Sequence, residues 1–324
     1  MTEQVLPGPD GWSVGLDVGG TKVLGVLLDT VGTVHQVVRV RTERGVEGVV
    51  SSSAHVVREL CAAAGLLPTD LVGVGAGIPG LVDPVTRAVS YAVNVGVERS
   101  GVPLGPLLSA ELGGVPVEVE NDLNAAALGA AHVMGLPGDL ALISLGTGMA
   151  AGILLDGRLR RGHLGGAGEI GHVPYVADGP VCPCGQRGCL ELYASGSAID
   201  AAWTSRSGRP APAEVFEAAA AGEPHALVVR DRFLEAVAAA VRMVVLTTDV
   251  EHVVLGGGVA EVGPVLLDEV RLTLRRQASG SAFLTGLRMA DRLRLVPRGV
   301  HVAPIGAALA VSRARMPRPA GAVL

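Results

Sequence analysis

The chain has 324 residues, of which 49% are hydrophobic and 18% are charged, and its formal net charge at pH 7 is −5. This composition is typical of a globular protein long enough for two cores, and the acidic balance argues against the basic footprint of a nucleic-acid-binding surface. Aromatic residues make up only 2%, which also argues against binding of single strands by base stacking.

The sequence predicts neither a secretory signal nor a membrane span. The N-terminal stretch MTEQVLPGPDG lacks the basic start and the apolar core of a signal peptide. The most apolar helical window, ALVVRDRFLEAVAAAVRMVVL, is interrupted by charged residues and predicts a buried amphipathic helix. We therefore expect a cytoplasmic protein, whose thiols stay reduced.

The first part of the chain predicts a mixed α/β unit. Residues 12–29 contain two apolar runs joined by a glycine turn, and residues 33–42 alternate with period two, so the chain begins with a predicted β-meander. Helical spacing follows over 47–65, and a buried strand is predicted at 71–80. A further strand over 115–122 runs directly into a predicted helix over 124–135.

The second part repeats the opening pattern. Residues 139–159 again read as strand, glycine turn and strand, and this weak internal repeat predicts two similar α/β halves. Mostly helical sequence follows to about residue 247, and we then predict a strand entering a glycine run, a helix, a strand and a final helix, at 252–260, 262–277, 293–299 and 304–315. We expect a smaller domain of residues 1–122 plus 303–324 and a larger domain of residues 123–302.

Three glycine-rich segments are candidates for holding a nucleotide. Turns without side chains present backbone N–H groups to a phosphate chain, and a third glycine run suits a flat base or ribose. Asp17, just before the first turn, is placed to hold Mg²⁺ through water. For any single segment, the alternative is that glycines simply join strands. The candidate residues are Gly19, Gly20, Thr21 and Lys22, then Gly146, Thr147 and Gly148, and finally Gly256, Gly257 and Gly258.

Polar residues gather where the strand over 115–122 meets its helix. Glu120, Asn121, Asp122 and Asn124 lie together in the segment VEVENDLNAAA. A helix cap explains one polar residue at such a junction, because Asp and Asn accept hydrogen bonds from the first free N–H groups. A helix cap explains four neighbouring polar residues less well. The functional interpretation is that Asp122 is a general base, which phosphoryl transfer to a hydroxyl requires.

Three of the four cysteines lie within eight residues. Cys182, Cys184 and Cys189 follow His172 at spacings of ten, two and five, which is a donor set that structural zinc accepts. A disulfide would leave one cysteine over, and a reactive thiol would need only one cysteine beside a base; both remain alternatives. Cys61, in the helix predicted over 47–65, is interpreted as a small buried apolar residue.

Taken together, the motifs resemble those of the ROK family (repressor, open reading frame, kinase), in particular its glucokinase-like branch. The resemblance runs through most of the chain and is carried by LDVGGTK (16–22), GIPGLVDP (77–84), ENDLNAAALG (120–129), GTGMAAGI (146–153), GAGEIGH (166–172), CPCGQRGCLE (182–191), SG (195–196), LGGGV (255–259) and IGAALA (305–310). Ala150 and Ala151 stand where the family has more glycine.

The resemblance implies an α/β fold of the actin-like, ribonuclease-H-like kind, with two domains, an interdomain cleft and a hexokinase activity that uses ATP and Mg²⁺. It implies that Asp122 is the catalytic base and that the chain forms a homodimer or homotetramer. We hypothesise that the zinc is structural and pins one ring nitrogen of His172 while the other contacts the sugar. The implied sugar ligands are Asn94, Asn121, Glu169, His172 and Glu191.

The resemblance leaves the substrate open. Glucose is the expected acceptor, with fructose, mannose, N-acetylglucosamine and N-acetylmannosamine as alternatives, and polyphosphate as an alternative donor. A sugar-sensing regulator and a catalytically silent scaffold are the other readings. The regulator is disfavoured because only about fifteen residues precede Asp17, too few for a DNA-binding domain.

Overall fold

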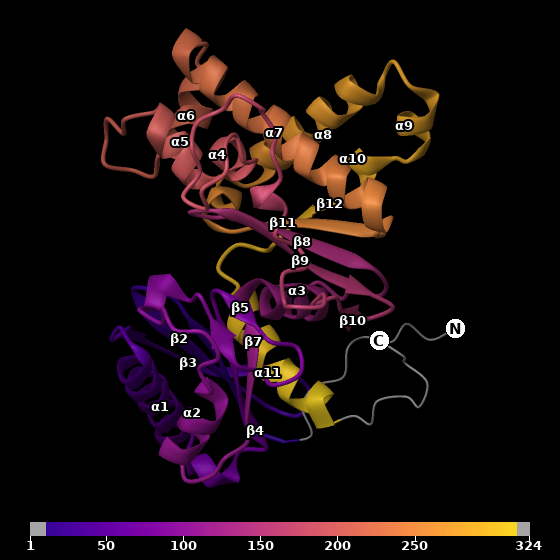
Figure 1. Cartoon of the computed structure of the whole chain (residues 1–324). Coiled ribbons are helices and arrows are strands. Elements are labelled where there is room, and N and C mark those ends of the chain that lie inside the picture. The colour runs from indigo at the N-terminus through magenta and orange to yellow at the C-terminus, as the bar shows by residue number, and fades with distance from the viewer. Residues whose placement is uncertain (1–10, 316–324) are drawn as a thin grey trace. The chain divides into compact units, whose positions relative to one another are not determined.

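The computed structural model describes residues 11–315, which form two compact α/β units (Figure 1). Among the described residues, the first unit comprises 11–137, 159–167 and 301–315, and the second comprises 138–158 and 168–300. Each unit contains a five-stranded mixed sheet and its own buried apolar cluster. The mixed α/β class predicted from the sequence is confirmed.

The sheet of the first unit has the strand order β3-β2-β1-β4-β7. Its first three strands pair antiparallel, which confirms the predicted β-meander, whereas β4 and β7 are parallel to β1. Strand β4 is buried at every residue, while the edge strand β3 alternates between half-buried and exposed positions. The strands are β1 (Ser13–Val18), β2 (Lys22–Leu28), β3 (Val34–Arg41), β4 (Gly73–Ile78) and β7 (Val117–Asn121).

Helices cover both faces of this sheet. Consecutive residues of β1 point to opposite faces: Leu16 lies on the side of α1, whereas Gly15 lies against α11. The last helix, α11, therefore packs on the first sheet although it follows the whole second unit in sequence (Figure 1). The helices are α1 (Val46–Ala63), α2 (Leu104–Glu111), α3 (Asp122–Val133) and α11 (Val302–Arg315), with a small hairpin of β5 (Leu81–Val82) and β6 (Val89–Ser90) and short 3-10 helices at Pro68–Asp70 and Val93–Val95.

Glycines allow α11 to approach its neighbours at backbone contact. A Cβ atom on Gly15 would lie 1.8 Å from the carbonyl oxygen of Pro304, and one on Gly306 would lie 1.7 Å from that of Ala125 in α3. Real side chains do not tolerate such distances, so glycine is required where α11 crosses β1 and α3. The close packing explains why α3 belongs to the first unit.

The sheet of the second unit has the order β10-β9-β8-β11-β12. Strand β8 pairs antiparallel with β9 and parallel with β11, and β11 pairs parallel with β12. This is the strand order of the first sheet, so the internal repeat predicted from the sequence is present as repeated topology. The strands are β8 (Leu140–Leu145), β9 (Met149–Leu155), β10 (Arg158–Leu159), β11 (His252–Gly256) and β12 (Leu293–Leu295).

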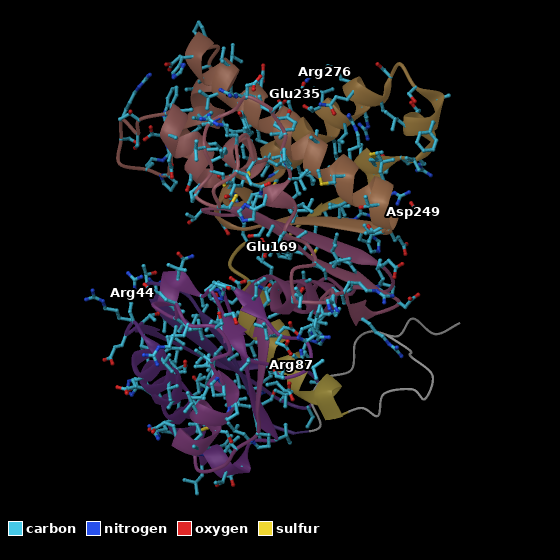
Figure 2. The ribbon with its side chains drawn as sticks, viewed as in Figure 1. Arg44, Arg87, Glu169, Glu235, Asp249 and Arg276 are labelled. Carbon is cyan, nitrogen blue, oxygen red and sulfur yellow. The ribbon has the colours of Figure 1, made fainter. Side chains whose placement is uncertain are left out.

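Seven α-helices and two 3-10 helices belong to the second unit within the described residues. Helix α7 supplies the centre of the apolar cluster through residues such as Phe233 and Val241. On its outer face, Glu235 forms an ion pair with Arg276 of α8 (Figure 2). The helices are α4 (Glu191–Ala194), α5 (Gly196–Ala202), α6 (Ala211–Ala220), α7 (Pro224–Thr248), α8 (Pro264–Ala278), α9 (Ala282–Gly286) and α10 (Met289–Arg292), with 3-10 helices at Ile170–His172 and Gly258–Val262. No helix between residues 11 and 315 combines the length and the apolar character that a membrane crossing needs.

The division into units differs from the expected domain boundary. We expected the first domain to end at residue 122, but the whole of α3 lies in the first unit, which continues to residue 137. Residues 159–167 also belong to the first unit. The physical reason is the packing of α3 on α11, which connects residues far apart in the sequence. Residues 1–10 and 316–324 of the expected first domain lie outside the described part of the chain.

Candidate functional site

The carboxyl edge of the first sheet brings two of the predicted acids to one place. In the parallel strands, Asp17 of β1 is in register with Gly77 of β4, and Gly77 is in register with Glu120 of β7. Gly77 has no side chain, and a Cβ atom there would lie 3.4 Å from the Cα atom of Asp122. Asp17 and Asp122 therefore lie on either side of β4 at the position of Gly77, at the edge where parallel sheets usually bind ligands.

Asp17 is a half-buried carboxylate at the end of β1. Burial raises its pKa above the ordinary value for aspartate, and the positive charges of Lys22 and His301 offset part of that rise. An acid held in this way gains from a further cation, because a cation favours the ionised form. The donor chemistry at Asp17 thus fits the predicted role in holding Mg²⁺, which stays a prediction.

The first glycine turn is held from two sides. The N–H of Gly19 donates to the carbonyl of Lys22 at 3.0 Å, and the hydroxyl of Thr42 donates to the carbonyl of Gly19 at 2.6 Å. A Cβ atom on Gly20 would lie 2.6 Å from the backbone oxygen of Asn94. Asn94 is exposed and lies beside the turn, so the structure brings this predicted sugar ligand to the edge that carries Asp17.

The junction between β7 and α3 is built by its own polar side chains. Asn121 is the N-cap of α3: its Oδ1 accepts from the N–H groups of Leu123 and Asn124 at 3.0 and 3.2 Å, and its Nδ2 donates to the carbonyl of Gly80 at 3.0 Å. The capping alternative is thus correct for Asn121. Asp122 is the first residue of the helix, and its Oδ1 accepts from the N–H of Leu123 at 2.9 Å.

Glu120 is buried, with 3% of its surface exposed, and has a basic partner that the sequence did not reveal. Its Oε2 accepts from Nε and Nη2 of Arg161, at 2.7 and 2.6 Å. Arg87 lies farther away, with Nη1 at 3.8 Å from the same oxygen. An acidic residue at a buried strand position is the signal that predicts such a partner, because buried charges are normally paired.

In the second unit, the other two glycine segments meet. A Cβ atom on Gly257 would lie 2.6 Å from the backbone of Leu145, the residue before the turn of Gly146, Thr147 and Gly148. The carbonyl of Gly146 accepts from the N–H of Gly196 at 2.7 Å. The structure therefore gathers residues 146–148, 196 and 256–258, as a shared nucleotide site would require. Ala150 and Ala151 lie in β9, outside the turn, so their side chains do not interrupt it.

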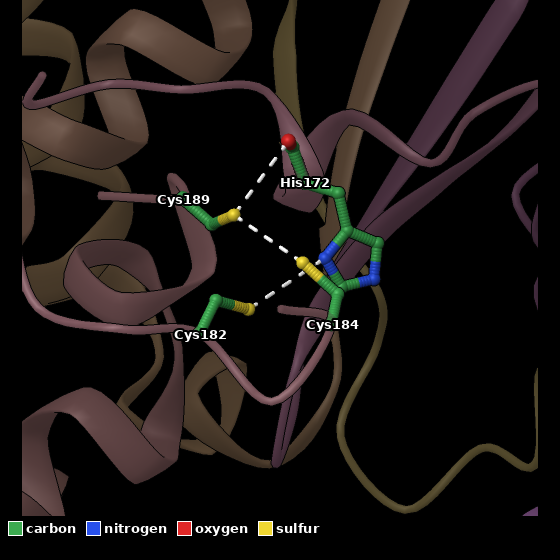
Figure 3. A group of neighbouring side chains, drawn as sticks. All are labelled: His172, Cys182, Cys184 and Cys189. Carbon is green, nitrogen blue, oxygen red and sulfur yellow. Dashed lines mark hydrogen bonds between the residues drawn. The ribbon is translucent and has the colours of Figure 1, made fainter. Parts of the chain in front are cut away.

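His172 and the three clustered cysteines come together as the sequence predicted (Figure 3). Their ligand atoms all lie within 4.8 Å of one another. Sγ of Cys182 is 3.9 Å from Nδ1 of His172, and the Sγ atoms of Cys184 and Cys189 are 3.6 Å apart. Tetrahedral bonds of about 2.3 Å give edges of about 3.8 Å, so this donor set fits zinc.

None of the four cysteines is in a disulfide, so that alternative is not supported by the structure. Burial raises the pKa of Cys182 to about 12, whereas the backbone N–H of Gln186 is the main cause that lowers the pKa of Cys184 to about 6. A metal must displace the proton from each thiol that binds it. The affinity of these thiols for a metal is therefore expected to fall as the pH is lowered. Cys61 is fully buried and burial raises its pKa to about 11, as expected for an inert apolar position.

The two predicted sugar-binding glutamates flank the imidazole of His172. Oε2 of Glu169 lies 3.9 Å from Nε2, and Oε1 of Glu191 lies 3.6 Å from Nδ1 and 3.2 Å from Sγ of Cys182. Oε2 of Glu191 would be 2.8 Å from a Cβ atom on Gly148. Glu191 therefore links the cluster of His172 and the three cysteines to the second glycine turn, within the same unit.

The family of the chain follows from comparison with known proteins. A family model described as "ROK family" matches residues 13–294. A glucokinase from Streptomyces coelicolor is 32% identical over 290 residues, covering 83% of this chain and 89% of that protein. An N-acetylmannosamine kinase from Citrobacter koseri is 32% identical over 265 residues, covering 76% and 83%.

A solved structure adds the fold. The crystal structure of a ROK family glucokinase from Streptomyces griseus, in complex with glucose and AMPPNP, is 30% identical with a TM-score of 0.76, covering 94% of this chain and all of that one. The fold is thus the actin-like two-domain fold of the ROK sugar kinases. With motifs, topology and a match over most of its length in agreement, the chain belongs to the ROK family.

Proposed function

We propose that this protein is a sugar kinase that transfers the γ-phosphoryl group of ATP to the 6-hydroxyl of glucose. The observation that carries the proposal is the row of Asp17, Gly77 and the Asn121-Asp122 junction at the carboxyl edge of the first sheet. Its family membership and its similarity to glucokinases support the same reaction. N-acetylmannosamine and the other hexoses named above are the alternative acceptors.

In the proposed reaction, Asp122 accepts the proton of the 6-hydroxyl as its oxygen attacks the γ-phosphorus. The bond from that phosphorus to the bridging oxygen breaks, and ADP leaves. Because phosphoryl transfer needs little covalent help, the remaining residues position the substrates. Backbone N–H groups of the two glycine turns suit the phosphates, and residues 256–258 suit the nucleoside. Asp17 would hold Mg²⁺, which supplies charge neutralisation when bound.

Sugar specificity is assigned to five polar side chains, Asn94, Asn121, Glu169, His172 and Glu191. Carboxylates, an amide and an imidazole match vicinal hydroxyls, and sites built for such bonds strongly penalise the wrong epimer. Asn121 already caps α3, so its contact with a sugar would add to the capping bonds.

The Cys₃His cluster is assigned to structural zinc. Nδ1 of His172 faces Cys182, so this nitrogen is the metal ligand and Nε2 remains on the side of Glu169. A metal on Nδ1 would fix the tautomer in which Nε2 carries a proton and can donate to a sugar oxygen. Zinc would thereby hold His172 and the loop that leads to Glu191 in register. We also propose that the chain forms a homodimer or homotetramer and that it is cytoplasmic. Its reaction would stand at the start of glycolysis.

A coupled ADP-release assay over glucose, fructose, mannose, N-acetylglucosamine and N-acetylmannosamine tests the proposal. We expect glucose to have the highest kcat/KM, with ATP preferred over polyphosphate as donor. A higher kcat/KM for another hexose would correct the substrate while leaving the reaction in place. No turnover of any hexose with either donor would overturn the proposed function.

A further inference from the structure

Glu120 uses both of its carboxylate oxygens to join three parts of the first unit. Oε1 accepts from the backbone N–H of Asn121 and from Nδ2 of Asn124, both at 3.1 Å. Oε2 accepts from Nε and Nη2 of Arg161, at 2.7 and 2.6 Å. With two donors on each oxygen, the carboxylate is fully satisfied although it is buried.

The partners of Glu120 lie at the place where the proposed base is held. Asn121 precedes Asp122, and Asn124 is in the first turn of α3, so Oε1 connects the end of β7 with the start of the helix. Asn121 in turn caps the helix. Any shift of the Glu120 side chain therefore reaches the backbone that carries Asp122.

Arg161 is itself anchored, and it comes from a distant segment. Its carbonyl accepts from the N–H of Ala167 at 3.1 Å, which closes the loop of residues 161–167. In that loop, Gly165 has a φ of 82°, and a Cβ atom there would lie 2.5 Å from the carbonyl oxygen of Val82. The loop is thus packed against Val82 of the first unit. The backbone from which Arg161 extends toward Glu120 is therefore held in place.

We infer that Arg161 is a positioning residue for phosphoryl transfer, acting through Glu120 to hold the Asn121-Asp122 junction in its productive geometry. The inference rests on the proposed function, because it gives Asp122 the role of base. Arg161 does not take part in the chemistry. Its guanidinium neutralises the buried carboxylate, and its two donors on one oxygen fix the direction of that carboxylate.

The test compares Arg161→Met and Arg161→Lys with Arg58→Met. Arg58 pairs with Glu111 on the surface of the same unit, with Nη2 2.8 Å from Oε1, so its loss removes an ion pair far from the junction in sequence and exposed to solvent. We expect Arg161→Met to lower kcat about 100-fold, because displacements of about 1 Å cost that much in a positioned site. Arg161→Lys keeps the charge and should recover part of the loss, while Arg58→Met should stay within about twofold.

Glucose titration by calorimetry separates positioning from loss of folded protein. A structural role would lower the number of glucose sites per chain, whereas the inferred role keeps that number and lowers kcat. Glu120→Gln retains the acceptor for Asn121 and Asn124 but loses the charge, so it should lower kcat to a similar degree. Combining it with Arg161→Met should then add little, because both changes break one interaction.

The outcomes are distinct. If Arg161→Met does not fold, Arg161→Lys decides, and a wild-type kcat in that variant overturns the inference. A loss of glucose sites in proportion to the loss of kcat also overturns it, and so do fully additive effects of Glu120→Gln and Arg161→Met. In each of these cases the wild-type enzyme still phosphorylates a hexose. If the wild-type protein phosphorylates no hexose, the proposed function fails, and the inference falls with it.

Discussion

The two sheets share a strand order but differ in the charge at their carboxyl edges. In the first, Asp17 of β1 is in register with Gly77 of β4; in the second, Ser144 of β8 is in register with Gly256 of β11. The two positions correspond in topology, and one carries a carboxylate where the other carries a hydroxyl. The same backbone therefore supports an acidic edge in one unit and a neutral edge in the other.

The glycine turns differ in the same sense. In the first turn, Val18 pairs with Val23 across four residues that include Lys22, whereas Leu145 pairs with Met149 across three uncharged residues. Under the proposed function, acid–base chemistry and the charge of Mg²⁺ would belong to the first sheet, and the second would offer backbone N–H groups suited to a phosphate chain. Topology alone thus does not assign function, which depends on the side chains placed at the edge.

The largest expected effect tests the acidic edge directly. Asp122→Asn should lower kcat by about 10²–10⁴-fold, the range for a general base, because an amide does not accept the hydroxyl proton. The fold should survive, since the amide oxygen can still accept from the N–H of Leu123 as Oδ1 now does at 2.9 Å. Steady-state ADP release and circular dichroism measure the two quantities.

Asp70→Asn is the matched control for that variant. Asp70 caps a short 3-10 helix of the same unit by accepting from the N–H of Leu67 at 2.7 Å, and it should keep wild-type activity when changed to the amide. Full activity in Asp122→Asn would show that the first sheet does not supply the base, and the contrast between the two edges would lose its meaning.

Local signals in the sequence predicted much of what the two units contain. The meander, the buried strand β4 and the apolar face of α7 follow from periodicity, and repeated strand-turn-strand patterns anticipate the repeated topology. The donor set of His172, Cys182, Cys184 and Cys189 was also predictable, because its members lie within eighteen residues of one another. Short separations keep the possible partners few.

The features that the sequence missed depend on long separations. Arg161 reaches Glu120 across 41 residues, and no local pattern selects it among the other arginines. The compact units divide differently from the expected domains, because Gly306 meets α3 through a contact between residues more than 170 positions apart. Asn121 shows a different limit: its sequence context fits both a cap and a sugar ligand, and only the hydrogen bonds identify the cap.

The second prediction asks whether the metal belongs to one unit alone. Cys189→Ala should abolish the bound zinc, expected at one ion per chain, as measured by elemental analysis. Amides of residues 172–191 should then exchange hydrogen faster, while those of α3 and α11 keep their protection. A loss of about 2 kcal/mol in the second unit would lower its melting temperature by about 4–8 °C.

Cys61→Ala provides the thiol control for the metal experiment. Cys61 is buried in α1 of the first unit, so its removal should leave the zinc content unchanged. Unchanged protection of residues 172–191 in metal-free Cys189→Ala would contradict a structural metal. Faster exchange in α3 or α11 would show that the metal stabilises both units, which is a different model from the one proposed.

The third prediction compares two helical glycines, one in each unit. Gly306→Ala places a Cβ atom 1.7 Å from the carbonyl of Ala125, so we expect a loss of about 3 kcal/mol, at the upper end for overpacking. Gly286→Ala, at the end of α9, meets nothing within 4 Å and should be neutral or slightly stabilising. Denaturant unfolding measures both, and equal effects would contradict the close packing of α11.

The smallest expected effect is a change in stability. It concerns two variants that change the charge at the matching positions of the two edges. Asp17→Asn removes a carboxylate whose pKa is raised by burial, and Ser144→Asp introduces a carboxylate at the corresponding place. The pKa of Asp17 is raised in the folded protein. The contribution of Asp17 to the free energy of unfolding is therefore complete below its unfolded pKa of about 3.9, and it is lost as the pH rises through its folded pKa. At pH 7 the wild-type protein therefore bears the cost of a buried charge, which Asp17→Asn removes.

Asp17→Asn should accordingly have a higher melting temperature than wild type at pH 7. The increase should be about 2–4 °C for each kcal/mol gained in the free energy of unfolding. This difference should shrink as the pH falls toward 4. Ser144→Asp should show the opposite sign with the same dependence on pH. The expected loss of kinase activity in Asp17→Asn would accompany its gain in stability, because a charge kept for function is a cost to the fold. Calorimetric melting of both variants from pH 4 to pH 8 measures the effect. If Asp17→Asn melts at a lower temperature than wild type at pH 7, the carboxyl edge of the first sheet stabilises the ionised carboxylate. The two sheets would then differ in how well they solvate a charge as well as in which of them carries one.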